Sequence, residues 1–173
     1  MEHDLEGDLS VLNREFDSQV GMLNAARLEV SGYHQLTQPI ALVWSLGQEF
    51  WSENDQTLVR LRGTEISKPR GFQDVWFASL GSKIALTHKF VMEFGLGYIS
   101  SPLEDSSLQS SDLPVDQQVR YSLGGRYQWD KTTNINMYYS YVDYGEPEIN
   151  NGAMQGRYDN DNHFVGVELD YRF

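Results

Sequence analysis

Alternation of apolar and polar residues is the feature that most limits how this chain can fold. In its last nine residues, VGVELDYRF, every second residue from Val165 to Phe173 is apolar, and the residues between are glycine or charged. The same period of two runs from Gln118 to Trp129, which is longer than an ordinary soluble strand. This period is typical of a strand with one apolar face, so we expect an all-β protein.

Seven segments carry this alternation, some of them weakly, and we expect each to be a strand. They are residues 25–36, 40–51, 73–86, 90–100, 117–129, 133–144 and 163–173. The connections between them alternate strictly in length: 37–39, 87–89 and 130–132 are short, whereas 52–72, 101–116 and 145–162 are long. Antiparallel transmembrane barrels have short periplasmic turns and long extracellular loops. The pattern therefore predicts an antiparallel transmembrane β-barrel of about seven or eight strands, whose short turns lie in the periplasm.

Pairing across the short turns gives a register that can be checked. If Trp129 lies opposite Thr133, then Arg126 lies opposite Asn136 and Ser122 opposite Ser140 on the polar face. The apolar face then holds the pairs Tyr127–Ile135, Gly125–Met137, Leu123–Tyr139 and Tyr121–Tyr141, and the preceding turn pairs Leu86–Phe90, Ile84–Met92 and Leu80–Leu96. A ten-residue apolar face, at about 3.3 Å per residue and about 40° of tilt, spans on the order of 25 Å. That height matches the apolar band of an outer membrane.

In this arrangement the apolar side chains face lipid and the polar ones face a lumen. Aromatic girdles are expected at the outer rim (Trp76, Tyr98, Tyr121 and Tyr141) and at the inner rim (Trp129, Tyr171 and Phe173). The charged lumen-facing candidates are Glu93, Arg120, Arg126, Glu168, Asp170 and Arg172. They fit either a mutually paired network that holds the wall in shape, which we favour, or a lining in which an arginine receives the carboxylate of an amphipathic acid.

Two alternatives concern the architecture. A soluble β-sandwich or lipocalin-like barrel would turn the apolar face inward, although strands this long with alternating loop lengths are unusual in those folds. Residues 1–24 form a partial strand and an extracellular loop in our reading, and Leu5, Gly7, Leu9 and Val11 alternate with polar residues. A strand there would give eight, enough to close a small barrel. Otherwise the chain, treated as one barrel region over 1–173, is the C-terminal part of a larger barrel, as the acidic start MEHDLEGDL, which lacks a signal-peptide pattern, suggests.

Composition and motifs exclude several chemistries. The formal net charge of −12 argues against nucleic-acid partners, and there are no cysteines to bind a metal. The four histidines (His3, His34, His88 and His163) show no metal-ligand spacing, so we predict no metal, no cofactor and no catalytic residue. The acids Glu146, Glu148, Asp159 and Asp161 suggest a Ca²⁺ site less strongly than a solvated acidic loop. A lipid-hydrolysing barrel using His34 or His163 ranks low.

The segment from Phe94 to Trp129 resembles the long-chain fatty-acid transporter family of outer-membrane proteins (FadL/TodX-like). The matching residues are Gly97-Tyr98, Ser101-Pro102, Leu113-Pro114-Val115-Asp116 and Tyr121-Ser122-Leu123-Gly124. Segments 72–81, 139–145 and 171–173 resemble the preceding and the last two strands, and HDLEGDL (residues 3–9) resembles the outer end of a mid-barrel strand. The resemblance covers nearly the whole chain.

The resemblance implies a fourteen-stranded barrel with an N-terminal hatch, from which ligand leaves through a gap in the wall. The hatch, the gap and the main ligand contacts belong to the part of the family pattern that is absent here, so no binding residue is carried over. We expect a monomeric protein of the Gram-negative outer membrane, in contact with lipid and lipopolysaccharide. It would allow passive uptake of hydrophobic compounds, fatty-acid-like ones above all, and would not be an enzyme. The alternative is a complete eight-stranded barrel with a structural or surface-binding role.

Overall fold

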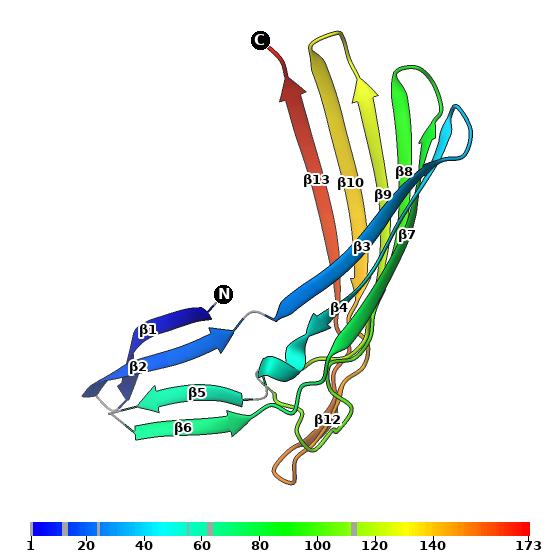
Figure 1. The fold of residues 1–173 in the computed structure, drawn as a ribbon. Coiled ribbons are helices and arrows are strands. Elements are labelled where there is room, and N and C mark those ends of the chain that lie inside the picture. Colours follow the sequence, from blue (N-terminus) through cyan, green and yellow to red (C-terminus); the bar gives the residue numbers. More distant parts are fainter. Residues whose placement is uncertain (1, 12–13, 24, 55, 62–63, 112–113) are drawn as a thin grey trace.

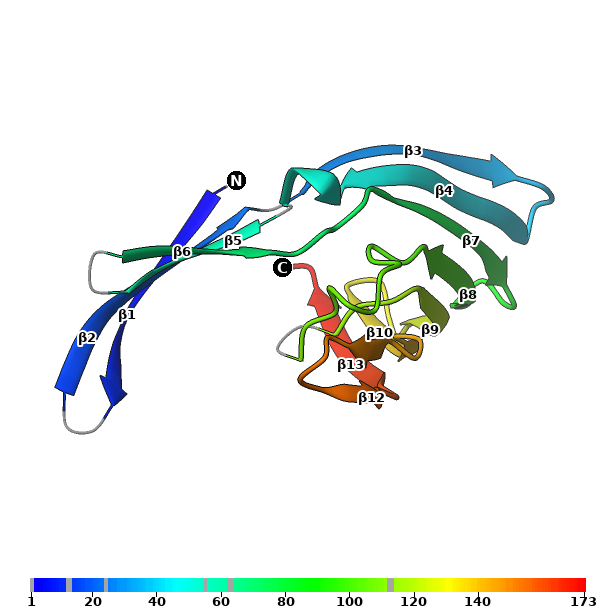
Figure 2. The ribbon, with the colours of Figure 1, turned by 90° about the horizontal axis from the view of Figure 1, so that it is seen from below.

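A curved antiparallel sheet of seven strands is the main feature of the structure, a computed structural model that describes residues 2–11, 14–23, 25–54, 56–61, 64–111 and 114–173. The sheet order is β13-β10-β9-β8-β7-β4-β3 (Figures 1 and 2). The strands are β3 (Ala26–Gln35), β4 (Ile40–Phe50), β7 (Val75–Ala85), β8 (Phe90–Ile99), β9 (Gln118–Gln128), β10 (Thr133–Asp143) and β13 (Asp161–Tyr171). Each begins and ends within two residues of its predicted bounds, and the all-β antiparallel fold is confirmed.

The predicted register across the short turns is also confirmed. The Trp129 N–H donates to the Thr133 carbonyl at 3.0 Å, and the Leu86 N–H donates to that of Phe90 at 3.0 Å. Every pair that we expected on β7–β8 and β9–β10 is present, including Arg126 opposite Asn136. A period of two with one apolar face leaves a single register in which all the apolar residues share a face, which explains why the sequence was sufficient here.

The two faces of the sheet differ in the way the alternation requires. We call the face bearing Leu80, Phe94, Leu123 and Val167 the convex face, and the opposite face the concave face. Apolar side chains on the convex face are open to the surroundings: Val167 is 72% exposed and Leu123 is 42% exposed. The soluble alternative needs these side chains in an interior, where they would be buried. An apolar face left open over this length is the surface that a lipid bilayer covers.

The two edge strands of the seven-stranded sheet run in the same direction. Neighbouring strands of an antiparallel sheet alternate in direction, so the first and the seventh strand point the same way. Strands β3 and β13 each pair on one side only within the described part of the chain. Joining them directly would create a parallel pair, which does not occur in an antiparallel barrel with an even strand count. Closing the wall therefore requires an odd number of further strands.

A second sheet lies beside the ends of β3 and β4 that carry the long loops (Figure 1). It has the order β1-β2-β5-β6 and consists of β1 (Glu2–Val11), β2 (Arg14–Leu23), β5 (Gln56–Leu61) and β6 (Thr64–Pro69). A short 3-10 helix, η1 (Trp51–Asn54), connects β4 to β5. Residues 2–11 thus form a strand, as the alternation indicated, but it pairs with β2 and supplies no eighth strand to the main sheet. Much of the segment 52–72, which we treated as a loop, is a hairpin that extends this second sheet.

The long connections at the same end of the main sheet fold onto one another. The hairpin of β11 (Glu148–Asn150) and β12 (Gln155–Arg157) meets the segment 100–111, where the Asn150 N–H donates to the Ser106 carbonyl at 3.0 Å. The most deeply buried side chains come from the hairpin and from the strands of the main sheet: Ile149 of β11, Val75 of β7 and Val142 of β10 are at most 2% exposed. No helix in the described part of the chain has the length and apolarity to cross a membrane.

Candidate functional site on the concave face

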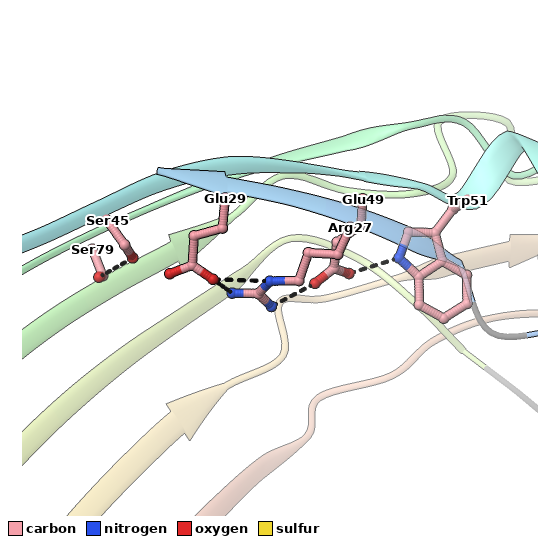
Figure 3. Close-up of polar contacts among 6 residues, drawn as sticks. All are labelled: Arg27, Glu29, Ser45, Glu49, Trp51 and Ser79. Carbon is pink, nitrogen blue, oxygen red and sulfur yellow. Dashed lines mark hydrogen bonds and ion pairs between the residues drawn. The ribbon is translucent and has the colours of Figure 1, made fainter. Parts of the chain in front are cut away.

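An arginine clamp lies at the loop end of the concave face, where β3, β4 and β7 meet. Arg27 makes ion pairs of 2.8 Å with both Glu29 and Glu49, and its guanidinium carbon lies 3.9 Å from the ring centroid of Phe77. The Trp51 indole N–H donates to Glu49 at 2.8 Å. Figure 3 shows Arg27 and Glu29 of β3, Glu49 of β4 and Trp51 of η1 on the side of the sheet that faces the partly enclosed space. Two carboxylates and an aromatic face hold this guanidinium, so its charge is already satisfied.

Small hydroxyl residues cover the middle of the concave face. Ser45 and Ser79 share a hydrogen bond of 2.7 Å between β4 and β7 (Figure 3). Ser122 and Ser140 share another of 3.0 Å between β9 and β10, as the predicted register indicated. Each hydroxyl forms its hydrogen bond with a hydroxyl on the neighbouring strand. Because these side chains are small and uncharged, the middle of the concave face is thin and only mildly polar.

A polar network occupies the turn end of the concave face. Arg126 donates to Asn136 at 3.0 Å, and the Asn136 amide donates in turn to Asp170 at 2.8 Å and to Glu168 at 3.5 Å. On the neighbouring strands Lys83 and Glu93 form an ion pair of 3.0 Å. The strand register sets Glu93, Arg120, Arg126, Glu168 and Asp170 on one face, and Arg172 follows the last residue of β13. That these residues line a lumen stays a prediction. Four of them take part in paired interactions of the wall; Arg120 and the side chain of Arg172 do not, within the described residues.

A cavity of about 300 Å³ opens on the concave face between the arginine clamp and β10. Its lining combines apolar groups with two guanidinium groups, and its principal residues are Arg27, Phe77, Ile99, Arg120 and Val142. Arg120 is exposed, and among the described residues no carboxylate pairs with it. A cation next to apolar walls can receive an anionic head group while those walls contact an apolar chain.

The acidic hairpin beyond the cavity is largely neutralised from within. Arg157 pairs with Glu146 at 2.7 Å and with Glu148 at 3.0 Å, and these carboxylates, Glu148 first, raise the pKa of Arg157. In the neighbouring loop, hydrogen bonds from the hydroxyl and backbone N–H of Ser107 lower the pKa of Asp105. Within the described ranges no group of three or more His, Cys, Asp or Glu residues is arranged to hold a metal ion.

The two histidines considered for hydrolysis both lie on the convex face. The Trp44 indole donates to His34 at 3.0 Å. His163 shares a hydrogen bond of 2.8 Å with the Tyr139 hydroxyl and lies 3.8 Å from Asp161. Neither contact includes a serine hydroxyl, so neither resembles the Ser-His-acid arrangement of a hydrolase.

Sequence reasoning missed the arginine clamp. Two of its residues, Arg27 and Glu29, alternate along β3 with Ser31 and form a polar face. The apolar residues between them are too irregular to mark the opposite face of a strand clearly. Lys83 was missed as the partner of Glu93, although the predicted pairing of β7 with β8 sets the two opposite each other. In both cases the strand register, and not a sequence motif, was the feature that could have revealed the interaction.

The fold and its two faces define a class of protein. A curved antiparallel sheet with an exposed apolar convex face and a charged, hydrogen-bonded concave face is part of the wall of a β-barrel of the outer membrane. The chain belongs to the family described as outer membrane protein transport protein (OMPP1/FadL/TodX), whose family model matches residues 5–173.

Curated proteins that are similar to this chain carry names that fit this family. Over 151 residues the chain is 25% identical to a long-chain fatty acid transport protein of Escherichia coli K12, covering 84% of this chain and 33% of the relative. Over 121 residues it is 26% identical to outer membrane protein P1 of Haemophilus influenzae, covering 66% of this chain and 25% of that one. The chain thus spans about a third or less of the length of these curated relatives.

Solved structures share the fold. A FadL homologue of Pseudomonas aeruginosa superposes with a TM-score of 0.79 at 18% identity, covering 91% of this chain and 37% of that one. The toluene transporter TodX of P. putida gives a TM-score of 0.70 at 18% identity, covering 98% of this chain and 42% of that one. Both similarities concern the architecture of the wall.

Proposed function

We propose that this chain is the C-terminal portion of the wall of an outer-membrane channel for passive uptake of hydrophobic compounds, with fatty-acid-like amphiphiles among its substrates. Membership of a transport family supports the channel, and the printed name of the E. coli relative supports the substrate class. No covalent step or cofactor is part of the proposal. The short turns face the periplasm and the long loops face outside, as in other barrels of this kind.

The observation that carries the proposal is the position of Arg120 in the concave cavity. Arg27 is held by two carboxylates and Arg126 by Asn136, whereas Arg120 has no carboxylate partner in the part of the chain that the structure describes. Its guanidinium shares the cavity with Phe77 and Ile99. An amphipathic acid would place its carboxylate on Arg120 and its apolar chain along these side chains.

Binding at such a site must remain weak for transport to occur. A ligand that binds too tightly does not leave, so conduction favours one accessible charge in a wet, open cavity over a deep, dry pocket. The exposure of Arg120 fits this requirement, because water weakens its attraction for a carboxylate.

A second candidate substrate class is the uncharged hydrocarbons. It is favoured by the printed title of the TodX structure, a toluene transporter, and by the apolar part of the cavity lining. An uncharged substrate would not use Arg120. The two classes can therefore be separated by changing this residue alone.

Uptake into liposomes tests the proposal. Full-length protein should speed the entry of oleate and of toluene over empty liposomes, and Arg120→Gln should slow oleate entry about two- to fivefold, the equivalent of roughly 0.5–1 kcal/mol from one solvent-screened ion pair. Arg157→Gln, on the outer hairpin, is the matched control and should have no effect. No acceleration by the unmodified protein would refute the channel, and equal oleate rates for both variants would refute the role of Arg120.

A further inference from the structure

Small side chains surround Arg120 in the row of residues that crosses the concave face at its height. The strand register sets Ser45 of β4 opposite Ser79 of β7. On its other side Ser79 lies opposite Gly97 of β8, which in turn lies opposite Arg120 of β9. All four residues line the concave cavity. Arg120 is thus the charged member of a row whose other three members are two serines and a glycine.

Gly97 leaves the space between Ser79 and Arg120 open. A Cβ atom at position 97 would lie 4.0 Å from the Cβ of Ser79 and 3.8 Å from the Cβ of Arg120. A branched side chain there would therefore stand between the hydroxyl and the guanidinium. The strands of Ser79 and Arg120 are roughly 10 Å apart, at about 4.8 Å per neighbouring strand. An arginine side chain covers most of this distance, so an anion above Gly97 can contact both groups.

The pair of serines keeps one hydroxyl hydrogen for a further acceptor. The hydroxyl oxygens of Ser45 and Ser79 lie 2.7 Å apart, and either can be the donor (Figure 3). A hydroxyl has a single hydrogen, so the hydrogen of Ser79 stays available when Ser45 donates to it. Neither hydroxyl makes a second hydrogen bond within the described part of the chain, and Ser79 is exposed.

Apolar side chains lie one row nearer the long loops. Phe77 of β7 faces Ile99 of β8, and both line the same cavity. Along their strands they lie two residues from Ser79 and Gly97, on the same face. The cavity therefore sets an apolar row directly beside a polar row with one accessible cation. This arrangement matches an acid whose carboxylate is joined directly to a hydrocarbon chain.

We propose that Arg120, the Ser79 hydroxyl and the open position at Gly97 together form a receptor for the free carboxylate of an aliphatic acid. Arg120 supplies the charge, and Ser79 donates to the carboxylate from the opposite side of the gap. An ester or a hydrocarbon carries no negative charge and gains little from either group. The receptor rests on the proposed function and specifies it further, since it distinguishes carboxylic acids from the uncharged substrates of the same channel.

Equilibrium binding of radiolabelled oleate to the full-length protein in detergent tests the receptor, with protein-free micelles as the blank. Gly97→Val fills the gap and should raise the dissociation constant about two- to fivefold, as Arg120→Gln should. Ser79→Ala removes one donor and should raise it about twofold. Binding to Gly97→Val and Ser79→Ala that equals binding to the unmodified protein would overturn the receptor.

The next row toward the turns supplies matched controls. Gly95 lies opposite Ser122, and the Ser122 hydroxyl shares a hydrogen bond with Ser140, as Ser79 does with Ser45. Neither Gly95 nor Ser122 lines the concave cavity. Gly95→Val and Ser122→Ala should therefore bind oleate like the unmodified protein. Losses as large as those of Gly97→Val and Ser79→Ala would show a general effect of such substitutions and would overturn the receptor.

Two further measurements separate a shared ligand from a change in cavity shape. Ser79→Ala combined with Arg120→Gln should bind oleate no more weakly than Arg120→Gln alone, because both groups hold the same carboxylate. Methyl oleate, which has no carboxylate, should bind equally to the unmodified protein and to all these variants. Losses that add in the double variant, or equal losses for methyl oleate, would overturn the receptor.

Failure of the proposed function gives a different result. Absence of faster oleate entry into liposomes with the unmodified protein would reject the channel, whatever the binding data show. Weaker oleate binding by Ser79→Ala and Gly97→Val, with methyl oleate unaffected, would still support the carboxylate receptor.

Discussion

The ring of Tyr138 on β10 lies directly over Gly166 on β13, its register partner on the concave face. A Cβ atom at position 166 would collide with the ring, so the ring occupies the space that any larger residue would need. The same device occurs on the convex face, where a Cβ at Gly125 would lie 3.2 Å from the Phe90 ring. Glycine at these positions lets large aromatic residues lie flat on a neighbouring strand.

Replacing Gly166 with leucine should therefore destabilise the barrel. We expect a loss of about 1 kcal/mol, because the Tyr138 ring, which is 56% exposed, must turn away from β13 and lose its contact there. The midpoint of urea unfolding in detergent, followed by tryptophan fluorescence, measures it. Gly156→Leu is the control, since a Cβ at Gly156 meets nothing within 4 Å. Equal midpoints for the two variants would contradict the packing argument.

Asp130 should make the stability of the β9–β10 turn depend on pH. Hydrogen bonds from the backbone N–H and the hydroxyl of Thr132 hold the pKa of Asp130 below its usual range. A carboxyl whose folded pKa is depressed stabilises the fold above its unfolded pKa of about 3.9, and this contribution is lost as the pH falls through the folded value.

The variant Asp130→Asn should therefore be less stable than the unmodified protein at pH 7 and should match it more closely below pH 3. Unfolding midpoints measured from pH 7 down to pH 2.5 test this. Asp159→Asn is the control, since the Asp159 carboxylate makes no hydrogen bond within the described residues. A constant difference between Asp130→Asn and the unmodified protein at every pH would exclude the linkage.

Removing Arg27 should weaken the loop end of the main sheet, where β3, β4 and β7 meet. Arg27→Ala leaves the carboxylates of Glu29 and Glu49 facing each other and uncovers the Phe77 ring. The guanidinium is half-exposed, so we expect a loss of only about 1 kcal/mol, from the cation–π contact and the partly screened ion pairs. The unfolding midpoint measures it, and the solvent-exposed Arg157→Ala should leave it unchanged. A larger effect at Arg157 than at Arg27 would reverse our ranking of the two sites.

The 173-residue chain produced alone should not form a detergent-resistant barrel. Its edge strands β3 and β13 run in the same direction and cannot pair antiparallel, so backbone N–H and C=O groups would be left unpaired in lipid at several kcal/mol per group. Without boiling, the full-length protein should migrate as a compact band in a gel with SDS, and the 173-residue chain should migrate as an unfolded one. A compact, heat-sensitive band for the short chain would show that it closes by itself.

The sequence alone determined the seven strands of the main sheet, the register across the short turns that join β7 to β8 and β9 to β10, and the face on which each of their side chains lies. An alternation of period two fixes a strand and both of its faces together, and the three-residue turns leave one register that keeps Leu123 with Tyr139 and Arg126 with Asn136. The family resemblance rested on the same segments, since these are local patterns that the chain carries in order.

Only the tertiary structure decided which polar residues meet and which stay available. The second ion pair of Arg27, with Glu29, the hydrogen bond from Asn136 to Asp170 and the cavity beside Arg120 depend on side-chain rotamers and on how strongly the sheet curves. The partner of the strand at residues 2–11 was likewise outside the reach of periodicity, because alternation marks a strand without naming its neighbour. Which strand lies next to which is decided by contacts between residues far apart in the sequence. The local alternation is compatible with several such pairings, and their relative free energies select one of them.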